Sequence, residues 1–287
     1  MDLDTVTQVH LARDRADLAR LGPGCSVLAG GTFLYSEPHD NIDALVDITT
    51  LGWPALRVSD AGLEIAATCT LAEFAGARPG RELGTTLMKP EWPGTALFAL
   101  SCRALLASHK IWRTATVGGN VCLSLPAGAV LGSLVALDAV ATVWGPLGER
   151  SIPLREFVFG PGVNALREGE VVRSFLVPTS GLLSRTSFRK IALAPLGRSG
   201  SVVMGVAMPD GSCAVTITAA TDRPVVLEFD TVPAEDAVAR AVASIDPARW
   251  FDDPHGAPDW RAHVTGLLAR EVVGELRDTG SAPTALS

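Results

Sequence analysis

The sequence predicts an α+β protein in two parts, a larger N-terminal region at residues 1–178 and a small α+β domain at 179–280. In the larger region, short apolar strands alternate with helical segments, whereas the smaller region shows one β-hairpin followed by two helices. The small polar residues at 179–181 mark the change. A chain of 287 residues that is 47% hydrophobic and 19% charged can bury the core of two domains.

The first half of the larger region combines a helix-like segment with short strands. A helical pattern of apolar residues runs from Thr7 to Leu21. Thr70 has the position of a helix N-cap, and Glu73 completes a capping box before a helix at 71–75. The strands expected in this half lie at 26–29, 45–48 and 63–67.

The second half of the larger region is expected to be richer in helix. Proline is favoured in the first turn of a helix, and Pro126 is therefore expected to open one. Pro178 ends the last strand, since proline cannot extend a sheet ladder. The elements expected are a helix at 92–106, a helix from Pro126 to about Asp138, a strand–turn–strand unit at 141–152 and a strand at 171–177.

The small domain begins with the clearest hairpin of the chain. Two apolar runs at 201–208 and 212–219 flank Asp210-Gly211, a dipeptide typical of tight turns. Amphipathic patterns predict helices at 234–245 and 260–276. The tail at 281–287 is expected to be disordered.

Composition argues against several classes of partner. The formal net charge is −7 and no basic run occurs, which disfavours binding to nucleic acid or to an anionic membrane surface. The longest apolar run, 127–137, is too short to span a bilayer. The acidic start Met-Asp-Leu-Asp-Thr is unlike a secretory signal, so a cytoplasmic protein with small-molecule or protein partners is expected.

Neither the cysteines nor the histidines form a recognisable motif. Iron–sulfur and zinc sites need thiolates at spacings such as C-x₂-C, which the sequence lacks. The histidines show no metal pair and no arrangement typical of a catalytic triad. We therefore expect no metal cluster and no general acid or base from these residues: Cys25, Cys69, Cys102, Cys122, Cys213, His10, His39, His109, His255 and His263.

Two glycine pairs about ninety residues apart indicate an anion site. They lie in Ala29-Gly30-Gly31-Thr32 and in Thr116-Val117-Gly118-Gly119-Asn120. Adjacent glycines allow consecutive backbone amides to surround a phosphate, because no Cβ hinders close approach or positive φ. Neither the Rossmann nor the P-loop signature occurs, so the sequence favours a pyrophosphate held between two loops of another fold.

In their order and spacing, these segments resemble the FAD-binding subunits or domains of molybdenum hydroxylases, the family of xanthine dehydrogenase and carbon monoxide dehydrogenase. The resemblance covers nearly the whole chain. The segments that carry it are 27–32, 45–48, 115–120, Pro126 with 136–139, 148–154 and Phe188-Arg189-Lys190.

The resemblance implies a two-part FAD-binding domain of the PCMH type, with subdomains at about 1–55 and 56–178, followed by a C-terminal domain like that of carbon monoxide dehydrogenase flavoproteins. It also implies that the first loop and Thr32 hold the pyrophosphate, that Leu106 flanks FAD, that Val172 lines the ring system and that Lys190 reaches in from the small domain. A solvated surface lysine is the alternative for Lys190. The residues implied at the cofactor are Val27, Leu28, Ala29, Gly30, Gly31, Thr32, Phe33, Leu34, Leu106, Thr116, Gly118, Gly119, Asn120, Val172 and Lys190.

Four places depart from the family pattern. Trp112-Arg113 replaces the usual Arg-Asn before the second loop, and Phe33 stands where many relatives have a polar residue. Ala129 replaces an acidic residue that often accepts a hydrogen bond from a ribose hydroxyl. The segment 192–198 is longer than its counterparts, so Arg198 has no match.

The function implied is that of an oxidoreductase subunit whose FAD passes electrons from the [2Fe–2S] clusters of a partner to an external acceptor. Molybdenum cofactor and clusters are expected only in partners, either as a large and a small subunit of a heterotrimer or fused in one chain. A free-standing flavin oxidase or reductase and an interaction subunit without FAD are the alternatives. The substrate, the oligomeric state and the acceptor, which could be NAD, oxygen or quinone, stay open. Valine at Gly31 or Gly118 is expected to abolish FAD binding with little loss of fold, by blocking approach of the phosphate.

Overall fold

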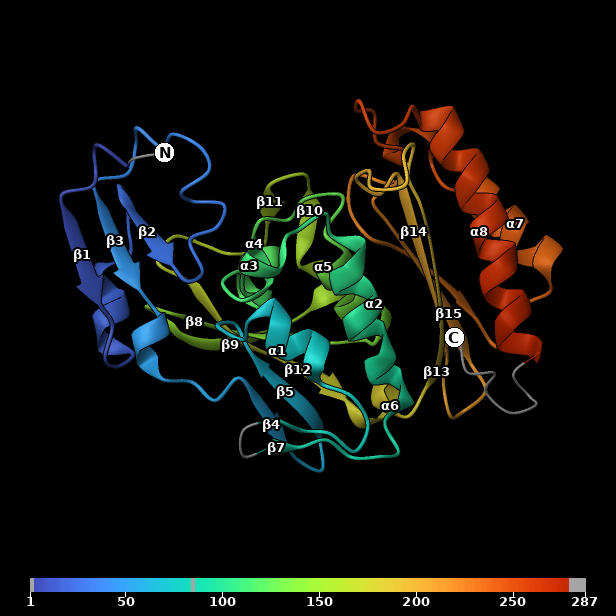
Figure 1. Cartoon of the computed structure of the whole chain (residues 1–287), viewed down its shortest axis with the longest axis horizontal. Helices are drawn as coiled ribbons and strands as arrows, with labels where there is room; N and C mark the ends of the chain where they lie inside the picture. Colours follow the sequence, from blue (N-terminus) through green and yellow to red (C-terminus); the bar gives the residue numbers. More distant parts are fainter. Residues whose placement is uncertain (1–2, 84–85, 279–287) are drawn as a thin grey trace.

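The computed structural model describes residues 3–83 and 86–278 and arranges them around three main sheets (Figure 1). A three-stranded sheet lies at the N-terminal end, a five-stranded sheet in the middle and a four-stranded sheet at the C-terminal end. The described residues also form two small two-stranded sheets. The expected disordered tail, 281–287, lies outside the described residues.

The N-terminal sheet is parallel, with β3 (Ala44–Asp47) between β1 (Gln8–Leu11) and β2 (Cys25–Leu28). It confirms the strands expected at 26–29 and 45–48, but the helix expected at 7–21 is wrong. The start of that segment pairs with β3, and only the short 3₁₀ helix η1 (Ala16–Arg20) follows. Asp14 explains the break, since its carboxylate accepts from the Ala16 amide at 2.8 Å and forms a turn.

The central sheet is antiparallel, and it contains the expected strands of the larger region. Its order is β4 (Leu56–Val58), β5 (Gly62–Ala66), β12 (Val171–Pro178), β8 (Val140–Gly145) and β9 (Gly148–Pro153). Helix α1 (Leu71–Gly76) begins at the expected capping box, in which the Thr70 side chain accepts from the Glu73 amide and the Glu73 carboxylate accepts from the Thr70 amide.

Two helices of this region begin later than the sequence indicated. Helix α2 (Ala96–Ala104) follows a 3₁₀ turn, η3 (Pro93–Thr95), and ends before the extended Leu105. Helix α5 (Ala129–Ala136) starts three residues after Pro126. The Pro126 carbonyl is not available to a helix, because it accepts from the Ala219 amide at 2.7 Å and the Thr218 hydroxyl at 3.0 Å. Tertiary contacts with the C-terminal sheet thus displaced the helix start.

Short elements connect these units. They are η2 (Thr49–Leu51), β6 (Glu82–Leu83), β7 (Thr86–Leu87), α3 (His109–Trp112), α4 (Val117–Cys122), η4 (Leu154–Glu156), β10 (Val158–Gly160), β11 (Val163–Asn164), α6 (Thr179–Leu182) and η5 (Pro247–Arg249).

The C-terminal sheet is buried on both faces. It consists of β13 (Arg185–Ile191), β14 (Ser201–Ala207), β15 (Cys213–Thr218) and β16 (Val225–Phe229). Val203 belongs to the core under α7 (Glu235–Ala243) and α8 (Pro258–Asp278), whereas Val202 and Met204 belong to the core of the central region. Alternation across a sheet covered on both faces explains the continuous apolar run of β14. The hairpin and both helices confirm the sequence prediction, and each of their ends lies within two residues of the expected position.

Candidate cofactor site

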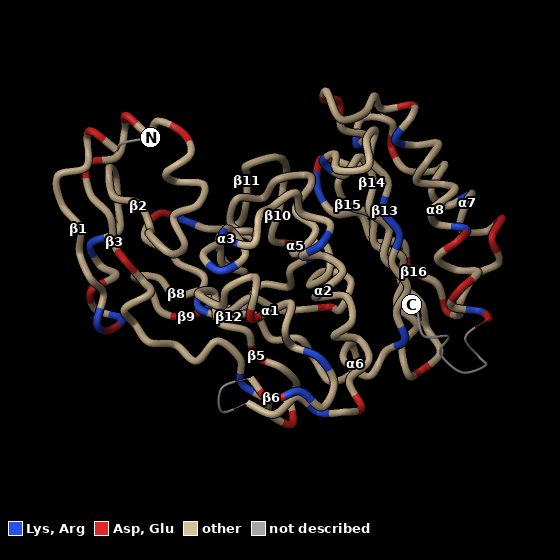
Figure 2. The backbone as a smooth tube through the Cα atoms, viewed as in Figure 1, with Lys and Arg blue, Asp and Glu red and all other residues tan. Residues whose placement is uncertain are grey.

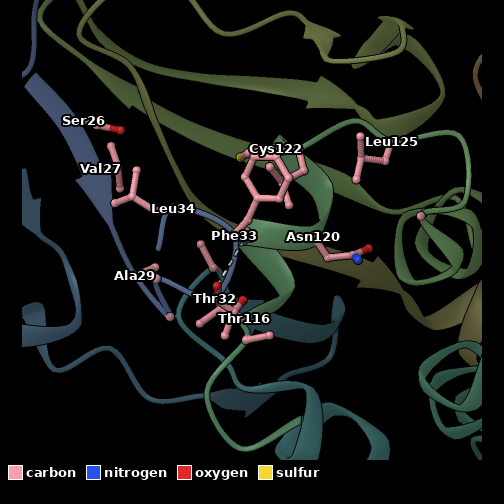
Figure 3. Close-up of a pocket in the computed structure, with 18 of the residues that line it drawn as sticks. Ser26, Val27, Ala29, Thr32, Phe33, Leu34, Thr116, Asn120, Cys122 and Leu125 are labelled. Atoms are coloured by element: carbon pink, nitrogen blue, oxygen red, sulfur yellow. Dashed lines mark hydrogen bonds between the residues drawn. The ribbon is translucent and has the colours of Figure 1, made fainter. Parts of the chain in front are cut away.

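A cavity of about 1060 Å³ opens where the three units meet (Figure 3). Its wall includes the loop after β2, the segment 104–107 after α2, helix α4, the start of β12 and residues of the C-terminal domain. Pockets for small molecules and cofactors typically measure about 300–1,000 Å³ and form where domains meet. The volume and position of this cavity suit a large cofactor.

The first glycine pair lies in an open loop whose backbone donors are free. The parallel strand β2 ends at Leu28, and Gly31 then adopts φ +66°, a left-handed conformation that favours glycine. Among the described residues, no carbonyl or side chain accepts a hydrogen bond from the five consecutive amides of Gly30 to Leu34. The Gly31 and Phe33 carbonyls, in contrast, accept from Tyr35 and Ser36 at 2.9 and 2.8 Å. A turn with a run of free N–H groups is an anion-binding concavity.

The second glycine pair has the opposite character. It forms the first turn of α4 rather than a loop, with Thr116 as the N-cap. The Val117 and Gly118 amides donate to the Cys69 and Ala67 carbonyls, both at 2.8 Å. The Thr116 hydroxyl accepts from Gly119 at 3.1 Å, and the Thr116 carbonyl accepts from Asn120 at 3.0 Å. These four amides are satisfied within the protein, so the expectation that this segment surrounds an anion with backbone donors is wrong for its N–H groups.

Close packing explains the glycines at 30 and 118. A Cβ at Gly118 would lie 2.7 Å from the Ala67 carbonyl oxygen, and one at Gly30 would lie 2.1 Å from the Thr114 carbonyl oxygen. Both neighbours are backbone atoms of the adjoining segments. These contacts argue against the expectation that valine at 118 would leave the fold intact, because that residue is buried against the segment after β5 before any ligand arrives.

Most residues expected at the cofactor come together in the cavity wall. Figure 3 shows several of them around one space, with the Phe33 ring extending from the first loop. The expected residues that line the cavity are Val27, Ala29, Gly30, Gly31, Thr32, Phe33, Leu34, Leu106, Thr116, Gly118, Gly119, Asn120 and Val172.

Leu28 and Lys190 are the two expected residues outside the cavity wall. The Leu28 Cδ1 atom lies 3.2 Å from where a Cβ on Gly31 would be, so Leu28 supports the glycine turn from behind. Lys190 is exposed on β13. The C-terminal domain instead contributes Arg198, Ser199 and His255 to the wall.

Arg198 is the basic residue best placed for an anionic ligand. It is half-buried, and the described part of the chain gives its side chain no hydrogen-bond or ion-pair partner. Its neighbours are held firmly: the Ser199 hydroxyl donates to the Ala104 carbonyl at 3.1 Å, and buried Arg261 donates to the Gly200 carbonyl at 2.6 Å. Arg198 could not be matched from the sequence, because the segment 192–198 is longer than its counterparts in the family.

Two thiols and one ion pair add to the wall. Burial raises the pKa of Cys122 to about 12, and burial together with the Asp43 charge raises that of Cys25. Both thiols therefore stay protonated at neutral pH. The hydrogen bond from Arg150 lowers the pKa of Glu170, which also accepts from the Arg167 amide at 2.8 Å. Glu170 is thus a fixed anion beside the start of β12.

The departures from the family pattern occupy particular places. Ala129 is buried in α5 outside the cavity wall, and the first turn of α5 is instead contacted by Asn120, whose side-chain oxygen accepts from the Leu131 amide at 3.4 Å. Trp112 packs against the central core with its Nε1 atom buried and unpartnered among the described residues. The Phe33 ring lies 6.5 Å from that of His39, centroid to centroid.

Residues 3–83 and 86–278 contain no group of three or more histidine, cysteine or acidic side chains that could hold a metal ion. Within the same ranges, every helix is too short or too polar to cross a membrane.

Several proteins of named function are similar to this chain in sequence. A xanthine dehydrogenase FAD-binding subunit of Escherichia coli is 27% identical over 179 residues, which are 59% of this chain and 56% of the relative. This chain thus spans just over half the length of that relative. A 6-hydroxypseudooxynicotine dehydrogenase complex subunit alpha of Paenarthrobacter nicotinovorans is 25% identical over 280 residues, covering 90% of this chain and 88% of the relative.

Solved structures share the fold. A chain of carbon monoxide dehydrogenase from Oligotropha carboxidovorans superposes with a TM-score of 0.76 at 19% identity, covering 93% of this chain and 96% of the other. A chain of quinoline 2-oxidoreductase from Pseudomonas putida gives 0.78 at 15% identity, covering 98% and 100%. The sequence profile described as the FAD binding domain in molybdopterin dehydrogenase matches residues 5–180, and the chain therefore belongs to that family.

Proposed function

We propose that this chain is the FAD-carrying electron-transfer subunit of a molybdenum-containing hydroxylase or dehydrogenase. It receives electrons from the [2Fe–2S] clusters of a partner and delivers them to an external acceptor. The observation that carries the proposal is the run of five free amides, 30–34, at one wall of a cavity built from three parts of a chain in the FAD-binding family.

The residues present fit FAD. Its pyrophosphate is a dianion that needs several N–H donors, and the first loop supplies them without competition from other acceptors. The Thr32 hydroxyl, which has no partner among the described residues, adds a further donor to this group. On the α4 side, the residues that would face the cofactor are Thr116, Gly118, Gly119 and Asn120, which line the cavity.

Apolar residues complete the site at the ring system. Leu106 flanks the isoalloxazine, and Val172, 1% exposed, lines it from β12. FAD itself supplies the redox chemistry, accepting and releasing electrons one or two at a time. The protein binds and orients the ring and excludes water from its buried face. No general acid or base is assigned.

The organisation of the complex follows from what this chain does not supply. We propose a molybdenum-cofactor large subunit and a [2Fe–2S] small subunit, separate in a heterotrimer or fused, because the described residues hold no metal site. All five cysteines are free thiols, which supports a reducing, cytoplasmic location. We also propose two domains. The FAD-binding domain is at 1–178, with subdomains at about 1–55 and 56–178, and the C-terminal α+β domain is at 179–280.

The test is the composition of the native complex, isolated gently through a tag on this chain. Acid precipitation should release FAD into the supernatant, because we propose non-covalent binding. Metal analysis should find about four iron atoms per molybdenum, as two [2Fe–2S] clusters require. A colourless chain that takes up no FAD would contradict the proposal and favour an interaction subunit. An active flavin-containing monomer without either metal would favour a free-standing oxidase or reductase.

A further inference from the structure

Charge is distributed unevenly along this acidic chain. Its formal net charge is −7, yet two long stretches, 92–137 and 171–209, contain no aspartate or glutamate. Arginines and lysines occur in both, so each stretch is locally basic. Such segregation concentrates positive potential where the two stretches meet in the fold.

The fold brings the two stretches to the same cavity. The hydrogen bond from the Ser199 hydroxyl to the Ala104 carbonyl joins them, and both 104–107 and 198–199 belong to the cavity wall. Figure 2 shows basic residues at α3 and along β13, the elements next to these segments. Four exposed side chains there have no hydrogen-bond or ion-pair partner among the described residues: Arg103, Lys110, Arg113 and Lys190.

Exposed leucines accompany these charges. The loop between β13 and β14 is closed at its base by a hydrogen bond of 2.8 Å from the Gly200 amide to the Ile191 carbonyl. It presents Leu193 and Leu196, which are 62% and 84% exposed, and Leu106 across the domain junction is 69% exposed. An ordered loop that holds leucines in water is typical of an interaction surface.

We infer that these residues form a docking face for the acidic surface of the iron–sulfur partner. We call it the basic–leucine face and define it as Arg103, Leu106, Lys110, Arg113, Lys190, Leu193 and Leu196. The inference rests on the proposed function, since it names the face through which electrons arrive. An apolar centre with a charged rim is the usual anatomy of an interface. Its position beside the cavity keeps the donor close to the flavin.

The charge of the face excludes one occupant and disfavours another. A second copy of this chain placed on it symmetrically would oppose basic residues to basic residues, which costs free energy. A small anion such as a nucleotide would use the positive charges but leave Leu193 and Leu196 in water. An acidic protein with apolar residues at its centre satisfies both parts of the face.

The test compares tagged variants of the full chain, expressed in the source organism, by the iron that co-purifies per FAD. Lys110→Glu with Arg113→Glu reverses two of the basic charges, and Leu193→Ser with Leu196→Ser removes the two exposed leucines; none of these four residues lines the cavity. The matched controls are Arg240→Glu with Arg277→Glu, on exposed residues of α7 and α8, and Leu147→Ser, on a residue 96% exposed in the β8–β9 turn.

Both face variants should keep their FAD and their melting temperature, because the changed side chains are exposed. Each should lose iron by about tenfold or more, and higher salt should narrow the difference between the charge variant and the wild type, because screening weakens both attraction and repulsion. Controls should keep iron at the wild-type level. Face variants that retain wild-type iron, or that alter only the KM for a nucleotide acceptor, would overturn the inference while leaving the proposed function intact. A wild-type chain that brings down FAD but no iron would instead overturn the proposed function.

Discussion

The two glycine pairs of this chain look alike in sequence but differ in the structure in whether their backbone amides are already hydrogen-bonded. The first, Gly30-Gly31, leaves a parallel strand and turns with free amides. The second, Gly118-Gly119, enters a helix, and its amides are already bound. In both pairs one glycine packs against the backbone of another segment, Gly30 at Thr114 and Gly118 at Ala67, so what separates the pairs is whether their amides are already bound.

The neighbours of each pair account for the difference. At the second pair, the Ala67 and Cys69 carbonyls after β5 meet the first amides of α4 and satisfy donors that a helix start normally leaves free. At the first pair, the chain has left the sheet, and the segment at Thr114 that packs against Gly30 accepts no hydrogen bond from the amides of 30–34. The first wall therefore supplies donors, and the second wall supplies shape.

Gly118→Val is expected to have the largest effect, and it acts on the stability of the apoprotein. Its branched side chain would collide with the Ala67 backbone, so the apoprotein should lose about 3 kcal/mol or more of unfolding free energy. Gly119→Ala is the control, because the nearest atom to its Cβ is the Thr116 hydroxyl at 3.1 Å and no backbone atom lies in its way. Thermal and urea unfolding of FAD-free protein measure both. An apoprotein of wild-type stability that merely fails to bind FAD would show that Gly118 serves the ligand.

Arg198→Ala asks whether free donors also come from the C-terminal domain. Loss of a charged hydrogen bond to a cofactor costs about 1.5–3 kcal/mol, so FAD affinity should fall by about ten- to a hundredfold. Arg198→Lys should restore part of it, and Lys190→Ala should leave it unchanged, because Lys190 lies outside the cavity wall. Fluorescence titration of FAD-depleted protein gives the dissociation constants. A larger loss for Lys190→Ala than for Arg198→Ala would contradict this assignment.

The two threonines that precede or follow the glycines should separate stability from binding. Thr116→Ala removes the N-cap of α4 and should cost about 1 kcal/mol of unfolding free energy, which Thr116→Ser should recover. Thr32→Ala should leave the stability of the apoprotein unchanged and weaken FAD binding. Paired unfolding and titration experiments on the three variants measure this. Equal stability losses at both positions would mean that the two walls do not differ.

The smallest expected effect is a pH dependence at the cavity wall. The pKa of Glu170 is lowered in the folded state, chiefly by Arg150, so its ionised form stabilises the fold above the unfolded pKa of about 4.3. That contribution should disappear as the pH falls through the folded pKa. Glu170→Gln should flatten this part of the stability curve measured by urea unfolding between pH 6 and acid. An unchanged acid slope would show that the ion pair contributes nothing.

Sequence reasoning worked where one local pattern decided the structure. The capping box at Thr70 and the hairpin around Asp210-Gly211 need no distant partner, and both are confirmed. It failed where tertiary contacts decided. Residues 7–21 have a helical pattern, but the start of the segment, Gln8–Leu11, pairs with β3, and the Pro126 carbonyl is taken by the C-terminal sheet.

The candidate site shows the same division. The glycine pairs identified most of the cavity wall, because backbone approach leaves a mark in the sequence. Arg198 and His255 left none, since loops of a distant domain bring them to the cavity. Nor could the sequence show that the first two amides of α4 were already bound, because their acceptors lie about fifty residues earlier at Ala67 and Cys69.

Amide hydrogen exchange tests the contrast between the two glycine segments most directly. Without FAD, the amides of 30–34 should exchange rapidly, because no group in the described part of the chain accepts from them, whereas those of 117–120 should be protected by their bonds. Adding FAD should slow exchange at 30–34 by about tenfold or more and leave 117–120 nearly unchanged. Protection at 30–34 before FAD is added, or FAD-dependent protection confined to 117–120, would contradict the account.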